Sequence, residues 1–343
     1  MCQGPEVSKL FSLTVVFLLF VFSVNARPQT TISGGRGMFR VQSARTVQSG
    51  SILVNTYFLA FFNNDKLNGY GNNHTLSIAL TYGLKDNLEI IGRVVPYQDD
   101  QVRDWGPPGE TTLGLKWCTL VGGKYVRTGL LSFFRLPTAK SHNVPYEAYS
   151  SGKVAMGISG LITFDVPSDL PLQFNANLGY LDNNIGTFFK NEGIDQLILG
   201  LGFKMPLGVF IFYSEFTGEI FLNNDKSSFI DNSMRITSGL KFKMPLNLVF
   251  DFGTDIGLSR KLDNYPAPLH EYGSWKIFGG LTFHIPPGGL YQNTAKKSSI
   301  QQDVRKEKVN DLKNRRENVD QKLQELLRDL ETKKDKNEKN EEN

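Results

Sequence analysis

Residues 75–84 read Thr-Leu-Ser-Ile-Ala-Leu-Thr-Tyr-Gly-Leu, and this stretch decides the fold. Its even-numbered residues are leucine, isoleucine and tyrosine, whereas its odd-numbered residues are small or carry a hydroxyl group. Side chains alternate between the two faces of a β-strand, so a period of two predicts a strand with one apolar face. Residues 172–180 and 246–259 show the same alternation.

The period of two recurs as far as residue 285 and predicts a series of strands. We assign strands to 51–62, 74–83, 88–97, 110–120, 125–136, 152–166, 171–181, 194–205, 208–221, 233–244, 246–259 and 274–285. Long connections are expected at 63–73, 98–109, 137–151, 182–193, 222–232 and 260–273. Short turns lie between them. Alternating short turns and long loops over an even number of strands are typical of outer-membrane barrels.

A repeat of the form Gly-Leu-x-aromatic supports the register of these strands. It occurs at 114–117, 200–203, 239–242 and 280–283. The leucine and the aromatic residue share the outward face, where aromatic rings favour a membrane–water boundary. The predicted membrane-interface aromatics are Tyr82, Trp117, Phe164, Phe203, Phe242 and Phe283 near the short turns, and Trp275 near the opposite rim. The alternative is that these rings fill the core of a soluble sandwich.

The opposite face of the strands carries many charges and decides between these alternatives. The predicted lumen-lining residues are Glu89, Arg93, Lys116, Lys204, Glu215, Glu219, Arg235, Lys241, Asp251 and Asp255. A dry soluble core cannot hold so many charges, because each costs several kcal/mol unless it is paired. The sequence therefore predicts an all-β fold. The predicted architecture is a closed up-and-down antiparallel transmembrane β-barrel of about twelve strands over residues 51–286.

The N-terminal region predicts export from the cytoplasm. Lys9 precedes an apolar run that ends in Val-Asn-Ala at 24–26, so residues 1–26 read as a secretory signal peptide. The alternative is a membrane anchor, for which the run is short. Residues 27–50 are rich in Gly, Ser and Arg and form a predicted periplasmic segment. This segment either plugs or lines the lumen, or forms a disordered linker.

The C-terminal flank has a different pattern. Residues 287–298 read as a linker, and 299–335 carry apolar residues at heptad spacing, which predicts a periplasmic helix or short coiled coil. Such a helix could self-associate or bind a periplasmic protein; the alternative is a lone, frayed helix. The Lys/Glu/Asn-rich tail at 336–343 is predicted to be disordered.

Four short stretches resemble bacterial outer-membrane channel barrels. They are 82–89 (Tyr-Gly-Leu-Lys-Asp-Asn-Leu-Glu), 109–116 (Gly-Glu-Thr-Thr-Leu-Gly-Leu-Lys), 175–180 (Asn-Ala-Asn-Leu-Gly-Tyr) and 214–219 (Ser-Glu-Phe-Thr-Gly-Glu). These stretches are similar to turns and strands of transporter barrels that are filed with phenol-degradation gene clusters. The plan of a barrel followed by a periplasmic segment is similar to that of outer membrane protein A-like proteins. The resemblance implies an outer-membrane channel without specifying its solute.

The sequence favours transport over catalysis. The chain has a net charge of +4 and no clustered basic motif, so no nucleic-acid partner is expected. It has four histidines and neither a Gly-x-Ser-x-Gly nor a His-Glu-x-x-His motif, and we predict no enzyme activity, metal site or cofactor. The lumen charges form either a constriction that screens small polar or charged solutes or a ladder of structural ion pairs.

Two functions follow from these alternatives. The first is a passive channel for small solutes in the bacterial outer membrane, with lipid around the barrel and the C-terminal tail in the periplasm. The second is a structural anchor whose periplasmic helix tethers a partner or the cell envelope.

Overall fold

The computed structural model describes residues 29–65, 69–99, 106–167, 171–187, 193–222, 224, 228–262 and 264–288. The predicted signal peptide (1–26), most of the linker (287–298), the C-terminal helix (299–335) and the tail (336–343) lie outside these residues. Among the described residues, no helix is long and apolar enough to cross a bilayer. Two 3₁₀ turns, η1 (Ile185–Thr187) and η2 (Phe229–Asp231), are the helical elements of this part of the chain.

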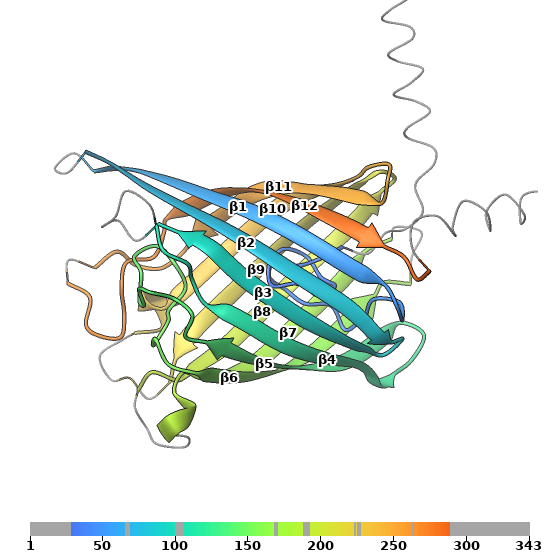
Figure 1. Cartoon of the computed structure of the whole chain (residues 1–343), viewed down its shortest axis with the longest axis horizontal. Coiled ribbons are helices and arrows are strands. Elements are labelled where there is room, and N and C mark those ends of the chain that lie inside the picture. The colour runs from blue at the N-terminus through green and yellow to red at the C-terminus, as the bar shows by residue number, and fades with distance from the viewer. Residues whose placement is uncertain are drawn as a thin grey trace, which may run out of the picture. The chain divides into compact units, whose positions relative to one another are not determined.

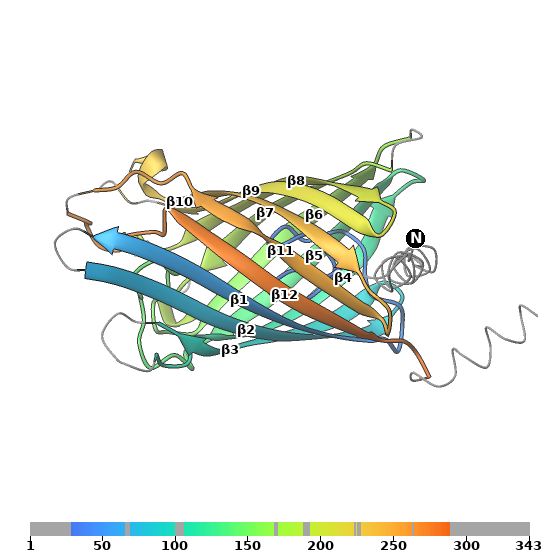
Figure 2. The ribbon, with the colours of Figure 1, turned by 90° about the horizontal axis from the view of Figure 1, so that it is seen from above.

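Twelve antiparallel strands close into one barrel, as the sequence predicts (Figures 1 and 2). The strands are β1 (Ile52–Asp65), β2 (Gly69–Lys85), β3 (Leu88–Gln98), β4 (Thr111–Gly122), β5 (Val126–Leu136), β6 (Ala155–Asp165), β7 (Gln173–Asp182), β8 (Gln196–Leu207), β9 (Phe210–Phe221), β10 (Ser233–Lys243), β11 (Leu248–Gly257) and β12 (Trp275–Ile285). Each strand pairs with its neighbours in sequence, and β1 pairs with β12 to complete the ring. Closure leaves no strand edge unpaired.

Short turns and long connections lie at opposite ends of the barrel, again as predicted (Figure 1). One predicted boundary is wrong. We expected a long loop at 63–73, but β1 and β2 stay paired as far as Asp65 and Gly69. The Asn- and Gly-rich composition of this hairpin is typical of a turn. Cross-strand pairing overrides that local preference, because strand preference depends strongly on tertiary context.

The outward face of the barrel is an apolar belt. Leu80, Leu178 and Leu201 leave 50%, 60% and 58% of their surface exposed, and outward isoleucines, valines and phenylalanines surround them. A water-soluble monomer rarely exposes so large a continuous apolar surface. A closed barrel with an apolar exterior and charged residues inside is suited to lipid outside, because its backbone polar groups are all paired within the sheet.

The predicted interface aromatics lie on this outward face. Strand register places the first six near the short turns, where Tyr82 pairs with Ile52 and Trp117 with Leu88. Tyr82, Trp117 and Phe164 are exposed, and so is Trp275 towards the long-loop end. The other three, Phe203, Phe242 and Phe283, are half-buried. Phe203 packs against Phe174 and Phe212, and Phe242 against Phe210 and Phe252.

Candidate functional site

Residues 29–47, which we call the plug, lie inside the barrel at its short-turn half (blue coil within the strands in Figures 1 and 2). Most plug side chains are buried. The sequence left open whether this segment occupies the lumen or forms a linker, and the structure shows the first arrangement for the described residues. The segment has little secondary structure of its own beyond two isolated bridges, Thr30–Arg36 and Gly37–Gln42. Contacts with the wall therefore define its conformation.

Hydrogen bonds or ion pairs join the plug to eleven of the twelve strands. The wall partners are Asn55 (β1), Thr81 (β2), Glu89 (β3), Lys116 (β4), Thr163 and Asp165 (β6), Asn177 (β7), Lys204 (β8), Glu215 (β9), Lys241 (β10), Asp255 (β11) and Thr282 (β12). Only for β5 do the described residues show no such bond to the plug. A segment held from almost every direction crosses the whole section of the lumen.

Glu215 accepts more backbone hydrogen bonds from the plug than the other wall residues named above. Its carboxylate accepts three consecutive backbone N–H groups of the plug, from Phe39 at 3.2 Å, Arg40 at 2.7 Å and Val41 at 3.0 Å. Successive N–H groups that point at one anion form a nest, which is a favourable anion site. The side chain is 2% exposed, so these charge-assisted bonds form away from bulk water.

A second attachment centres on the buried pair Lys241 and Asp251. The ammonium group of Lys241 lies 2.7 Å from an oxygen of Asp251 and donates to the carbonyl oxygens of Thr30 at 2.9 Å and Met38 at 3.1 Å. The hydroxyls of Tyr57 and Tyr213 donate to the same carboxylate at 2.7 and 2.9 Å. Every polar atom of the pair is thus compensated, as a buried ion pair requires.

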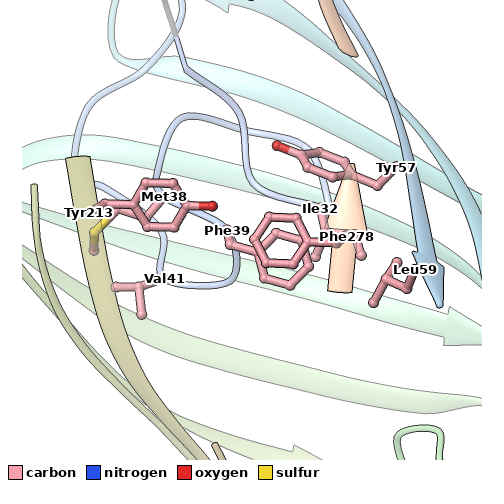
Figure 3. Packing of buried hydrophobic residues seen from close by; sticks show 8 residues of the cluster. All are labelled: Ile32, Met38, Phe39, Val41, Tyr57, Leu59, Tyr213 and Phe278. Atoms are coloured by element: carbon pink, nitrogen blue, oxygen red, sulfur yellow. The ribbon is translucent and has the colours of Figure 1, made fainter. Parts of the chain in front are cut away.

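Apolar packing completes the attachment of the plug. Ile32, Met38, Phe39 and Val41 form one cluster with Tyr57, Leu59, Tyr213 and Phe278 of the wall (Figure 3). The rings of Phe39 and Phe278 stack with centroids 3.9 Å apart. Inward glycines make room for this packing. A Cβ on Gly202 would lie 2.3 Å from the terminal carbon of Met38, so a larger residue there would force the Met38 side chain to move.

The ten predicted lumen residues fall into two groups. Six bind the plug or a residue that binds the plug: Glu89, Lys116, Lys204, Glu215, Lys241 and Asp251. Three line a cavity beyond it: Arg93, Glu219 and Arg235. Asp255 joins the two groups, because it pairs with Arg40 of the plug at 2.5 Å and with Arg235 at 3.1 Å. Cross-strand ion pairs, one of the two alternatives, are therefore present, as in Lys116–Glu89 at 2.6 Å.

The cavity lies between the plug and the long-loop end of the barrel and has a volume of about 240 Å³. Its floor includes Ile32, Arg40 and Val41 of the plug, and residues 139–150 of the β5–β6 connection contribute to its opposite side. The wall contributes apolar and charged side chains from most strands. Among the described residues, no group of three or more His, Cys, Asp or Glu side chains is placed to hold a metal ion.

The β5–β6 connection folds inwards and is fixed by Glu147. The carboxylate of Glu147 lies 2.6 Å from the ammonium group of Lys276 and 2.6 Å from the hydroxyl of Thr75. Burial alone would raise the pKa of Glu147, but Lys276 and Thr75 hold that pKa below its ordinary value. Next to it, Tyr149 packs with Phe221 and Leu269.

This contact predicts that the docking of the β5–β6 connection into the lumen depends on pH. A carboxyl group with a depressed pKa stabilises the docked connection above its ordinary pKa of 4.5 and loses that effect as the pH falls further. His270, whose ring contacts the Glu147 carbonyl oxygen at 2.8 Å, has a pKa lowered by burial, so its protonation in acid acts in the same direction. We expect the protection of residues 143–150 against hydrogen–deuterium exchange, relative to the intrinsic rate at each pH, to fall below about pH 5. In Glu147→Gln this protection should be low already at pH 7, and the part of the acid step that Glu147 contributes should be lost; an unchanged pH profile would contradict the assignment.

Several residues of the site escaped sequence analysis. Arg135 shares the inward parity of Leu131 and Phe133 on its strand, so the alternation in β5 could have identified it. Arg40 and Glu147 lie in segments without periodicity, and no local signal places them in the lumen.

Comparisons with known proteins find similar solved structures at low sequence identity. No family model matches the chain, and no curated protein matches it as a relative. A KdgM porin has 6% identity and a TM-score of 0.45, with 67% of this chain and 98% of that chain covered. An outer membrane channel from Pseudomonas putida F1 has 9% identity and a TM-score of 0.49, covering 71% and 98%. A NanC porin has 9% identity and a TM-score of 0.43, covering 67% and 98%. Likeness at this level transfers neither solute nor activity.

Proposed function

We propose that this chain is a channel for small polar or charged solutes in the bacterial outer membrane, and that its own N-terminal segment gates it. The observation that carries the proposal is the nature of the plug. It fills the lumen through non-covalent contacts with a wall that is largely polar. A polar wall stays compatible with water when the plug leaves, whereas an apolar core would collapse or remain dry.

The size of the barrel is compatible with this function. Twelve strands spaced about 4.8 Å apart and tilted by about 40° enclose a ring about 24 Å across between backbones. Inward side chains occupy about 5 Å on each side, as they do between packed sheets, which leaves a passage of about 14 Å without the plug. Small hydrated solutes fit this width.

Planar-bilayer recording of the refolded full chain tests the proposal. We expect discrete openings from a closed baseline, because the plug must move before ions pass. Insertion is verified separately by protease protection of the strands. A bilayer that remains silent with inserted protein, even after the plug has been deleted, would contradict the channel.

The anchor remains a second candidate, and the seal made by the plug favours it. If the plug never leaves, the barrel is a closed membrane anchor for the predicted helix at 299–335. Deletion of residues 290–343 separates the two functions. If the chain is a channel, the deletion should leave solute flux intact. If it is an anchor, the deletion should reduce envelope integrity while the flux stays unchanged, so envelope integrity is the measurement that separates the two. The predicted periplasmic partner or self-association of this helix is tested by the same deletion.

A further inference from the structure

Two arginines and a threonine form a row across three neighbouring strands. Strand register pairs Arg93 of β3 with Thr112 of β4, and Thr112 with Arg135 of β5. All three line the cavity. Neighbouring strands are about 4.8 Å apart, so the two arginine backbones lie roughly 10 Å from each other with the threonine between them. Arginine side chains are long enough for both guanidinium groups to reach a ligand above Thr112.

Neither arginine has a carboxylate partner within ion-pairing distance among the described residues. Arg93 donates from Nε to the Ser77 hydroxyl at 2.8 Å, and Arg135 donates to the Tyr149 carbonyl oxygen at 3.4 Å. These bonds position the side chains without neutralising their charge.

Two of the acids around the cavity have cationic partners. Glu147 pairs with Lys276, and Asp255 pairs with Arg40 and Arg235. Glu110, two residues before Thr112, also lines the cavity and accepts a hydrogen bond from the Ser150 hydroxyl, which leaves its negative charge in place. Glu219 also lines the cavity, but it lies on β9, whereas the row spans β3 to β5. Arg93 and Arg135 together outnumber the single carboxylate of Glu110, so this side of the cavity has a net positive charge.

Apolar side chains surround this cationic side. Ile91 and Val95 flank Arg93 on the inward face of β3, and Leu131 and Phe133 precede Arg135 on β5. Guanidinium groups bind carboxylates through paired N–H donors, and an adjacent apolar wall favours a ligand with a hydrocarbon body. At about 240 Å³ the cavity is small compared with sites for drug-sized ligands, so a ligand of about ten non-hydrogen atoms suits it.

We propose that the cavity binds a small monocarboxylate with an apolar body, of the size of benzoate. Its carboxylate lies between Arg93 and Arg135 over the Thr112 hydroxyl, and its hydrocarbon part rests on Leu131 and Phe133. The proposal deepens the channel function, on which it rests, by naming the class of solute that the lumen selects.

Calorimetric titration of the refolded full chain in detergent tests the site. We expect sodium benzoate to bind, and neutral benzamide and cationic benzylammonium to bind at least about tenfold more weakly, because charge-assisted bonds are lost. Arg93→Gln and Arg135→Gln should each weaken benzoate about tenfold by the same reasoning. Arg127→Gln is the matched control. Arg127 belongs to the same strand as Arg135 but is exposed and does not line the cavity.

Lysine variants keep the test decisive if a glutamine variant does not refold. Arg93→Lys and Arg135→Lys retain the charge and should keep benzoate affinity nearer to that of the unsubstituted chain. Equal binding of benzoate and benzamide, or equal losses in Arg127→Gln and Arg135→Gln, would overturn the site. The titration needs no bilayer. Arginine-dependent binding with a bilayer that stays silent even after deletion of the plug would refute the channel and keep the site. Conduction without benzoate binding would do the reverse.

Discussion

Replacement of Glu215 by alanine is expected to open the channel about a hundredfold more often than in the unsubstituted chain. Its carboxylate holds three consecutive N–H groups of the plug. Hydrogen bonds to charged groups contribute about 1.5–3 kcal/mol each, and water replaces part of them when the plug leaves. A net loss of about 3 kcal/mol corresponds to a roughly hundredfold rise in the open fraction. Open probability in planar bilayers measures it.

Two further variants define the scale of this effect. Deletion of residues 27–47 should produce a lasting open level, because the plug then no longer crosses the lumen. Glu219→Ala is the matched control, since Glu219 lies on the same strand and lines the cavity but makes no described hydrogen bond to the plug. If Glu215→Ala and Glu219→Ala gated alike while the deletion conducted freely, Glu215 would not be the latch.

Replacement of Lys241 by methionine is expected to lower the free energy of unfolding by about 3–5 kcal/mol, the usual cost of removing one member of a buried ion pair. The substitution leaves the Asp251 carboxylate buried with two tyrosine hydroxyls and no cation within ion-pairing distance in the described structure. It also removes the donor to the Thr30 and Met38 carbonyl oxygens. Urea unfolding of the barrel in lipid vesicles, followed by tryptophan fluorescence, measures the change.

The double variant Lys241→Met/Asp251→Asn should recover a large part of that loss, because it removes the uncompensated charge. Lys85→Met is the control, since Lys85 is exposed at the end of β2. A loss in Lys241→Met no greater than in Lys85→Met would show that the buried pair does not stabilise the barrel.

The twelve strands were predictable because alternation is a local signal that every strand carries. Residues 75–84 show it, and each predicted strand overlaps an observed one. The β1–β2 hairpin was misjudged at its tip because Asn63, Asn64 and Gly71 have turn composition, and their pairing becomes visible only in the sheet. The inward charges were also predictable from parity. Their partners were not, because an ion pair such as Arg40–Asp255 joins residues far apart in sequence.

The plug shows where sequence reasoning stops. Residues 29–47 have no periodicity, and their composition equally fits a linker. Their conformation depends on eleven strands that the local sequence does not contain. One indirect signal was present. Glu215 faces Gly202 and Thr237 on the adjacent strands and has no cation opposite it, so its carboxylate needs further polar partners.

The plug also bears on how the barrel is assembled. The first and last strands meet at a seam, and the plug bonds to both sides of it. The Asn55 amide on β1 donates to the Thr31 carbonyl oxygen, and Thr30 shares a hydrogen bond with Thr282 on β12. Only a few residues separate the plug from β1, so it travels with the first strand while the sheet curls. Pairing of β1 with β12 and enclosure of the plug are therefore coupled events. The segment that blocks the finished pore also serves as the core around which the barrel closes.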